Sequence, residues 1–173
     1  MTSASQMQAQ AGLEFRLQEQ RQLAQAAGIY REILASNADH ADALHWLGVI
    51  AYQTGDLPAA LDLISRSLAI NPKSALAHAN LGHTLYTLGR LEESLASYDK
   101  ATALRPDHAD SYNNRGSVLN NLRRHDEALD SHGKAIALRP DFAEAHSNRS
   151  IALLERIGDQ GTNPKPIGAI NSK

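Results

Sequence analysis

Apolar residues recur along this chain at helical spacing, in stretches that alternate with short polar turns. One stripe contains Leu44, Leu47 and Ala51. The next contains Leu57, Leu61, Ile64 and Leu68. Residues three or four apart lie on one face of a helix, so each stretch predicts an amphipathic helix. The pattern therefore predicts an all-α chain.

Turn residues separate the two helices of each pair. Gly55 and Gly89 stand at the centre of two such turns, where glycine can adopt the left-handed conformation that ends a helix. Pro58 stands where the second helix begins, a position that tolerates proline because the first-turn amides have no partner. Each unit is therefore predicted to be a helical hairpin.

The hairpins repeat with a fixed step. Three prolines close successive units 34 residues apart (106 − 72 and 140 − 106), namely Pro72, Pro106 and Pro140. A small-residue column keeps the same step, at Gly48, Gly82, Gly116 and Ser150. A second small column contains Ala60, Ser94 and Ala128. Small residues let the paired helices approach, and a lone hairpin leaves apolar surface bare, so neighbouring units must stack.

The period, with its Leu-x2-Leu-Gly phrase, later alanine, aromatic residue and closing proline, resembles the tetratricopeptide repeat. The resemblance covers residues 7–156 and implies a right-handed superhelix of about four helical hairpins plus one terminal helix. Three units are clear, at 41–74, 75–108 and 109–142.

The two ends of the predicted array are less regular. A divergent unit is expected over 7–40, with Ala38 where the proline should stand. Its residues in phase are Leu13, Leu17, Ala26, Tyr30 and Ile33. A half repeat is expected over 143–156, as one helix. Residues 1–6 and 157–173 lack the pattern, and we expect both segments to be disordered.

One asparagine per repeat stands two residues before the small column, at Asn80, Asn114 and Asn148, and Trp46 holds this position in the first clear unit. In this family the first helices line the inner groove. A side-chain amide can pair with both the N–H and the C=O of an extended peptide. The three asparagines therefore predict peptide binding; the alternative is that they only solvate the groove.

Neighbouring groove positions predict a mostly neutral, partly aromatic lining, formed by Tyr52, His83, Tyr86, Asn113, Ser117 and Asn121. Trp46 with Tyr52 predicts an aromatic pocket at the N-terminal end of the groove; alternatively, Trp46 packs against the preceding unit. A carboxylate clamp for acidic C-termini would need Lys or Arg where His45, His83 and Asn113 stand. The lining therefore counts against a repeat domain of the carboxylate-clamp type.

Charge and composition narrow the partners. Seventeen Lys and Arg against nineteen Asp and Glu give a net charge of −2, so we expect neither nucleic acid nor a membrane surface as a partner. The chain has no cysteine, no cationic leader and no apolar run of about 18 residues. We therefore expect a cytoplasmic protein.

No pattern predicts catalysis, a cofactor or a metal. The eight histidines lack the same-face spacing of metal pairs, and neither a nucleophile elbow nor a phosphate-binding loop occurs. We expect a non-enzymatic scaffold or adaptor that binds an extended segment of a partner protein.

Two alternatives stay open. The asparagine ladder resembles that of the repeat domain of O-linked N-acetylglucosamine transferases, which implies a substrate-recruiting region acting for a separate catalytic domain. The helix over 143–156 also offers a surface for self-association, by stacking on the N-terminal unit of another copy.

Overall fold

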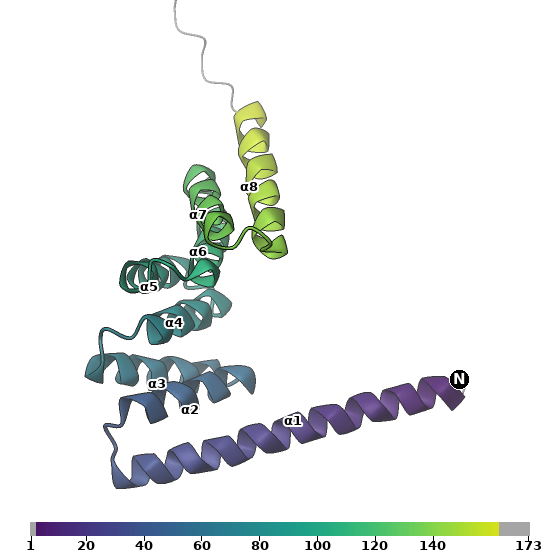
Figure 1. Ribbon diagram of the computed structural model, residues 1–173, viewed down its shortest axis with the longest axis vertical. Helices are drawn as coiled ribbons and strands as arrows, with labels where there is room; N and C mark the ends of the chain where they lie inside the picture. The colour runs from purple at the N-terminus through teal and green to yellow at the C-terminus, as the bar shows by residue number, and fades with distance from the viewer. Residues whose placement is uncertain (1–2, 163–173) are drawn as a thin grey trace, which may run out of the picture. The chain divides into compact units, whose positions relative to one another are not determined.

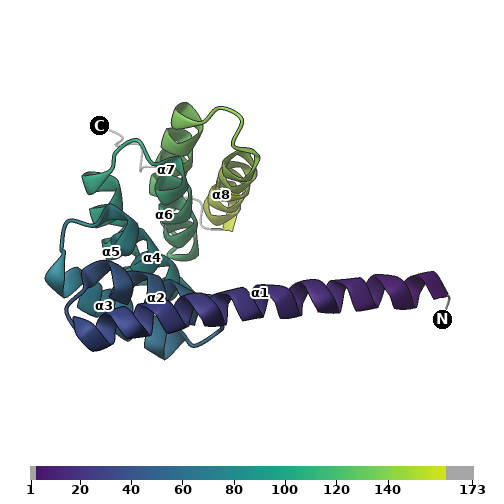
Figure 2. The ribbon, with the colours of Figure 1, turned by 60° about the horizontal axis from the view of Figure 1, so that its bottom comes forward.

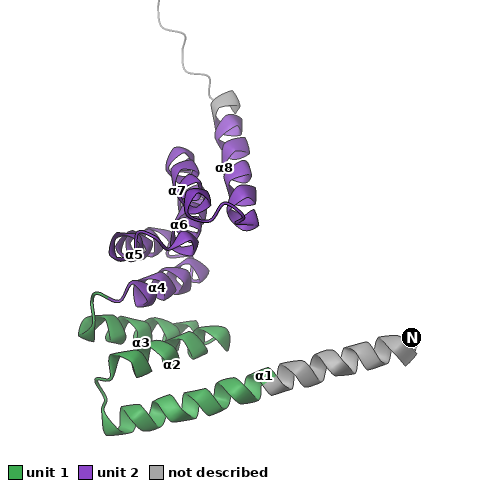
Figure 3. Ribbon diagram, in the orientation of Figure 1, with its two compact units in different colours: residues 1–73 green, residues 74–173 purple. Residues whose placement is uncertain are grey.

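The computed structural model describes the backbone of residues 3–162 and the side chains of residues 19–159. Within this part the secondary structure is entirely helical (Figure 1). The helices are α1 (Ser3–Ser36), α2 (Ala41–Gln53), α3 (Leu57–Ile70), α4 (Ala75–Thr87), α5 (Leu91–Leu104), α6 (Ala109–Asn121), α7 (His125–Leu138) and α8 (Ala143–Thr162). The chain divides into two compact units, residues 1–73 and 74–173 (Figure 3). An all-α chain is confirmed.

Side chains just before several helices fix where those helices begin. Asp56 Oδ1 accepts a hydrogen bond from the amide of Ala59 at 3.1 Å, and Ser74 Oγ accepts one from the amide of Ala77 at 3.2 Å. Each cap satisfies a first-turn N–H that has no partner inside its helix. These local bonds explain why the polar turn residues separate the helices.

The turn inside each hairpin needs one residue with positive φ. Gly55 has φ +86° and Gly89 has φ +73°, so the predicted role of both glycines is confirmed. In the third hairpin the same column holds Arg123, with φ 61°. A side chain in this conformation costs on the order of 1–2 kcal/mol, and Arg123 forms an ion pair with Asp159 of α8.

In unit 1, α2 and α3 form a hairpin around a close contact. A Cβ added at Gly48 would lie 2.7 Å from Cγ1 of Ile64, and Ile64 is fully buried. Ser67 Oγ, near the end of α3, donates to the carbonyl of Ala41 at the start of α2 at 2.8 Å. The small column therefore sets the spacing of the two helices.

The predicted hairpin over 7–40 differs from the structure, in which α1 is one helix from Ser3 to Ser36. Gln20, Arg21 and Gln22 occupy the turn columns, 34 residues before the turn around Gly55. All three lie inside α1, because glutamine and arginine favour a helix and none supplies the flexibility of glycine. The prediction of a disordered 1–6 is also wrong for residues 3–6, which are helical; residues 1 and 2 lie outside the described part.

Unit 2 contains the hairpins α4–α5 and α6–α7, followed by α8, which packs against α7 (Figures 1 and 2). Its core contains Leu95, Tyr98, Val118, Leu119, Ala128, Leu129 and Ala152. At the step from α5 to α6, Arg115 Nε donates to Asp99 Oδ1, and its Nη1 donates to Ser131 Oγ, both at 2.6 Å. Successive repeats are thus joined by polar contacts as well as by the core.

Helix α8 is longer than the predicted helix over 143–156 and continues to Thr162. The expected disorder over 157–173 is therefore wrong for residues 157–162, and residues 163–173 lie outside the described part. Polar contacts hold this end of α8: His125 Nε2 lies 3.0 Å from Asp159 Oδ2, and Arg156 Nη1 donates to Asp126 Oδ1 at 2.9 Å. Among the described residues, no helix is long and apolar enough to cross a membrane.

Candidate functional site

Unit 2 has a small polar hollow on the side of its first helices, with a volume of about 160 Å³. It is lined by Tyr86, Ser117, Asn120, Asn121, His132, Asn148 and Ile151. These residues come from α4, α6 and α8, with His132 added from α7. Four of them were predicted from the sequence: Tyr86, Ser117, Asn121 and Asn148. None of the lining side chains is an acid, a lysine or an arginine.

Side-chain hydrogen bonds across this hollow join consecutive first helices. Asn121 Nδ2 on α6 donates to the hydroxyl of Tyr86 on α4 at 3.0 Å. Asn148 Nδ2 on α8 lies 3.4 Å from Ser117 Oγ and 3.2 Å from Asn113 Oδ1, both on α6. Part of the polar lining is therefore already used to hold neighbouring repeats together.

Asn113 does not line the groove, and the structure corrects the prediction that it does. Its side chain is 1% exposed. Its Nδ2 donates to Glu144 Oε1 at 3.0 Å, and its Oδ1 lies 3.0 Å from His132 Nδ1. With Asn148 also donating to this oxygen, the amide is occupied by residues of α7 and α8. A buried amide with these partners serves packing between repeats.

His132 is a site residue that the sequence interpretation missed. It is 1% exposed, and burial, with the positive charge of Arg149 as a smaller cause, lowers the pKa of His132 to about 4. The imidazole is therefore neutral at pH 7. Because Asn113 Oδ1 is an acceptor, His132 Nδ1 carries the proton in this bond, and its Nε2 has no hydrogen-bond partner. The sequence signal that could have identified His132 was its position in the repeat, because Ile64 and Tyr98 at the same position of earlier repeats face the glycine column.

The three ladder asparagines are all half-buried, but they differ in what remains open. Asn148 uses its Nδ2 within the chain. Asn114, whose side chain has no hydrogen bond in the described part of the chain, offers both a donor and an acceptor. Only Asn148 lines the hollow; Asn80, Asn114 and the exposed His83 do not.

Trp46 and Tyr52 belong to unit 1. Trp46 is 40% exposed on α2, and its ring centroid lies 4.9 Å from that of the buried His45, at an interplanar angle of 40°. Tyr52 is half-buried near the end of the same helix. Neither residue lines the cavity that unit 1 contains.

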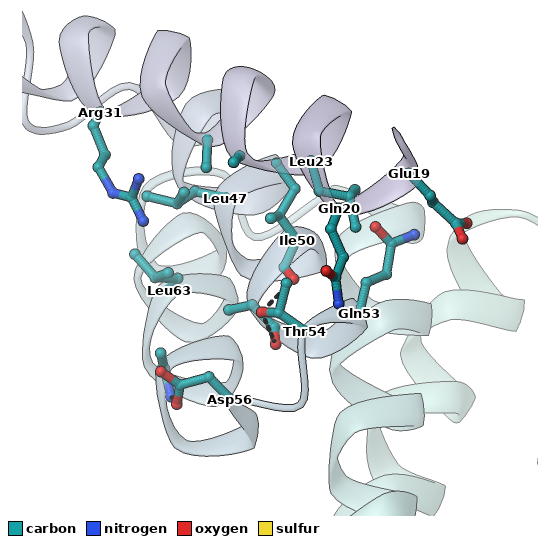
Figure 4. Close-up of a pocket in the computed structure, with 14 residues that line it drawn as sticks. Glu19, Gln20, Leu23, Arg31, Leu47, Ile50, Gln53, Thr54, Asp56 and Leu63 are labelled. Carbon is teal, nitrogen blue, oxygen red and sulfur yellow. Dashed lines mark hydrogen bonds between the residues drawn. The ribbon is translucent and has the colours of Figure 1, made fainter. Parts of the chain in front are cut away.

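That cavity lies between α1, α2 and α3 and has a volume of about 980 Å³ (Figure 4). Leu23, Ala27, Leu47, Ile50 and Leu63 contribute apolar walls, while Glu19, Arg31 and Asp56 stand among its polar lining residues. Ala27, one of its lining residues, occupies the column filled by Leu61, Leu95 and Leu129 in the later repeats.

Neither hollow has the composition of a metal centre. Over the residues whose side chains are described, no group of three or more His, Cys, Asp or Glu could hold a metal ion. What the hollow of unit 2 offers chemically is neutral hydrogen bonding beside the exposed apolar surface of Ile151.

Sequence models of one repeat family match most of this chain. Two models described as tetratricopeptide repeat match residues 16–75 and 109–142, and one described as TPR repeat matches residues 82–122. No curated protein matches the sequence.

Solved structures share the fold. A crystal structure of MamA protein has a TM-score of 0.75 at 21% identity, covering 85% of this chain and 81% of that one. YrrB, described as a TPR protein with an unusual peptide-binding site, has a TM-score of 0.69 at 24% identity, covering 76% and 68%. The first TPR of Spaghetti (RPAP3), bound to the HSP90 peptide SRMEEVD, has a TM-score of 0.66 at 19% identity, covering 68% and 93%. The expected fold class, an all-α superhelix of helical hairpins, is confirmed.

Proposed function

Because this chain belongs to the tetratricopeptide-repeat family, we propose that it is a non-catalytic scaffold that holds an extended segment of a partner protein against the first helices of unit 2. The observation that carries the proposal is the neutral polar hollow formed by Tyr86 on α4, Asn121 on α6 and Asn148 on α8. Two neighbours of similar fold are described with peptides, which supports an interaction role.

The open amide groups suit a peptide backbone. Asn114 is free to donate and to accept, and the Oδ1 of Asn148 is free to accept, because only its Nδ2 is used within the chain. A backbone presents one N–H and one C=O per residue, so side-chain amides can hold it without reading its side chains. An extended strand leaves these groups unpaired, whereas a helix uses them internally.

The lining also restricts the ligand by charge. No ionised side chain lines the hollow, and His132 stays neutral at pH 7 because its pKa is about 4. An acidic segment such as SRMEEVD would find no cation there to balance its carboxylates. We expect neutral segments, with an apolar side chain placed against Ile151, to bind better than acidic ones.

The affinity should be moderate. Two to three backbone hydrogen bonds contribute about 0.5–1.5 kcal/mol each, and ordering an extended peptide offsets part of this gain. With one apolar contact added, we expect a dissociation constant that is roughly micromolar.

The test is a capture experiment with the wild type and with a variant carrying Asn80→Ala, Asn114→Ala and Asn148→Ala. Proteins retained from the source lysate are identified, and their extended segments are synthesised. Binding is then measured by fluorescence anisotropy. We expect the triple variant to bind at least tenfold more weakly while circular dichroism shows unchanged helicity.

A matched control removes three exposed side chains from the second helices, with Lys100→Ala, Asp130→Ala and Lys134→Ala. This control should bind like the wild type. Equal binding by the asparagine variant and the wild type would contradict the proposal, as would equal loss of binding in both variants.

The exposed face of α8 favours a second proposal, stacking of α8 on the N-terminal unit of another copy. Leu154 is 69% exposed and Ile157 is 57% exposed, a larger apolar surface than single exposed residues provide. A head-to-tail contact leaves a free surface at each end of an open assembly, so mass should rise with concentration. The Leu154→Glu substitution should abolish that rise, as measured by sedimentation. A wild-type mass independent of concentration would refute the stacking.

A further inference from the structure

One face of α8 is exposed in columns that the earlier first helices bury. Leu153 is 36% exposed, whereas Leu85 of α4 and Leu119 of α6 in the same column are 4% and 0% exposed. Ser150 is exposed, whereas Gly116 in its column is buried. This face is named the uncovered face of α8 and comprises Arg149, Ser150 and Leu153.

In the preceding hairpin the second helix covers this face. A Cβ added at Gly116 would lie 2.6 Å from the ring of His132 on α7, and Leu119 belongs to the same core as Ala128 and Leu129 of α7. Among the described residues of unit 2, no second helix follows α8 (Figures 1 and 2). The uncovered face is therefore the surface on which a second helix packs in the other repeats.

The uncovered face differs from the apolar surface of α8 that includes Leu154. Leu154 stands 34 residues after Asn120, and Asn120 Nδ2 donates to Glu155 Oε2 on the first helix of the following repeat. The column of Leu154 therefore faces along the stack of repeats. The column of Ser150 faces the second helix of its own repeat, so the two surfaces of α8 suit different occupants.

Arg149 is the charged residue of the uncovered face, and Arg115, its equivalent in the preceding repeat, shows how such a guanidinium is paired. Arg115 Nε donates to Asp99 Oδ1, and its Nη1 donates to Ser131 Oγ, both at 2.6 Å. One acceptor comes from the preceding second helix, and the other comes from the second helix of the same repeat. The guanidinium of Arg115 thus bridges two second helices.

Arg149 lacks these partners in the described part of the chain. Gly133, which has no side chain, stands 34 residues after Asp99, and a Cβ added at Gly133 would meet nothing within 4 Å. The place that Asp99 fills in the preceding repeat is therefore open on α7. Within residues 19–159, the side chain of Arg149 forms no hydrogen bond or ion pair. A carboxylate that arrives from outside would find an unpaired cation here.

We propose that the uncovered face of α8 binds an amphipathic helix of a partner protein, in the position of a second helix, with a carboxylate of that helix paired to Arg149. A helix of this kind buries its apolar stripe against Leu153. Opposite charges across the contact fix its register. The residues of this chain that follow α8, 163–173, contain neither Asp nor Glu, so they supply no carboxylate side chain for Arg149.

Ser150 narrows the class of partner further. In the second helices the residue that faces the glycine column is large, namely Ile64, Tyr98 or His132, and a Cβ on the glycine would lie only 2.6–2.9 Å from it. Ser150 carries this Cβ, so a second helix of another copy does not fit in the same position. The partner helix therefore needs a small residue opposite Ser150. Because Ser131 directly precedes His132, the acid of the partner should directly precede this small residue.

The probe is a fluorescent peptide with the sequence of α7, His125–Leu138, carrying Ser131→Asp, His132→Ala and Gly133→Ala. Aspartate then stands where Ser131 meets Arg115, and alanine stands opposite the glycine column. The control peptide carries Ser131→Asn with the same two alanines, so it keeps the shape and loses the charge. Anisotropy with the full chain should show about fivefold tighter binding of the aspartate peptide than of the asparagine peptide.

Two positions in the protein separate charge from shape. Arg149→Gln should remove the preference for the aspartate peptide, whereas Lys100→Gln, which removes an exposed cation on α5, should keep it. Gly133→Asp restores the acid of the preceding repeat, so Arg149 gains a partner within the chain and the preference should disappear. Gly133→Asn introduces a side chain of the same shape without charge and should leave the preference unchanged.

Failure of the wild type to bind either peptide at millimolar concentration would overturn the proposal, and so would an unchanged preference in Arg149→Gln. A wild-type dimer that becomes monomeric in Arg149→Gln, measured by light scattering, would assign the face to another copy instead. A gain of about tenfold in peptide affinity on deletion of residues 163–173 would assign the face to that segment. Binding of extended peptides is measured separately with the asparagine variant, so either proposal can fail without the other.

Discussion

The Cα atom of Gly116 lies directly against the imidazole of His132, so that an added methyl group would stand 2.6 Å from Cε1 and 2.7 Å from Nε2 of the ring. The preceding hairpin repeats this relationship, with Gly82 facing Tyr98 at 2.9 Å. Real Cβ atoms do not approach other atoms this closely, so the helices of each pair can reach their observed spacing only with glycine in this column.

Gly116→Ala should destabilise unit 2 by about 1–3 kcal/mol, because the ring of His132 is held by Asn113 and cannot move aside without cost. The free energy of unfolding in urea measures this loss. A change within experimental error would mean that the α6–α7 pair can separate without penalty, contrary to this structure.

Gly133 provides the control for that substitution. It lies inside α7, and a Cβ added there would meet nothing within 4 Å. Gly133→Ala should therefore stabilise the protein by about 0.5–1 kcal/mol, because alanine restricts the unfolded chain and favours a helix. Opposite signs for the two Gly→Ala changes would establish that contact with His132, and not helix propensity, decides the outcome.

Buried His132 predicts a loss of stability in acid. Its pKa is lowered from 6.5 to about 4 by burial, with Arg149 as the smaller cause. On acidification the unfolded chain therefore binds this proton first, so the stabilisation is fully present above pH 6.5 and is lost as the pH falls toward 4. The shift corresponds to about 3 kcal/mol.

The effect of His132 is isolated by comparison with His132→Tyr, which introduces the residue of the preceding repeat. Urea unfolding is measured for both proteins between pH 4 and 7. The difference in free energy of unfolding should shift in favour of the tyrosine variant by about 3 kcal/mol across this window. Parallel pH profiles would show that His132 titrates normally in the folded chain.

Sequence patterns predicted the hairpins over 41–142 because the residues that form their turns act locally. Gly55 and Gly89 sit where the backbone turns with positive φ, and the period of 34 residues repeats the same local solution. The same columns led to a wrong prediction at 7–40, because apolar residues in phase with the later repeats suggested a hairpin. The spacing of apolar residues indicates which helix faces are buried. Whether the chain reverses direction depends on the turn residues, and those at 20–22 favour a helix.

The candidate site was harder to predict, since a column position does not show which neighbour a side chain meets. Asn113 and Asn114 are adjacent and both polar, yet one is 1% exposed within the repeat stack and the other is half-buried without a partner. The partner of Asn113, Glu144, lies 31 residues away on α8. That contact depends on how successive repeats pack, which no local pattern specifies.

Substituting Asn113 and Asn114 one at a time separates an effect on stability from an effect on binding. Asn113→Ala should cost about 1–3 kcal/mol of stability, because it leaves His132 Nδ1 without its partner in a buried site. Asn114→Ala should change stability by less than about 0.5 kcal/mol and weaken peptide binding instead. Urea unfolding and peptide anisotropy on both variants measure the two effects; an equal loss of stability in both would contradict the assigned roles.

A larger side chain in place of Ala27 can fill part of the cavity of unit 1. Ala27 is 4% exposed and lines the 980 Å³ space between α1, α2 and α3, in the column that leucine fills at Leu61, Leu95 and Leu129. Ala27→Leu should therefore stabilise the protein by about 1 kcal/mol, because the added carbons become buried without displacing others.

The control for Ala27→Leu is Ala35→Leu, the same change at an exposed position of α1. Both substitutions alter helix propensity equally, so the difference between their effects on the unfolding midpoint reports burial alone. A gain only for Ala27→Leu would show that α1 docks on α2 and α3 and that the space beside Ala27 accepts a larger side chain. Equal effects would mean that α1 does not pack there firmly enough for a filled cavity to matter.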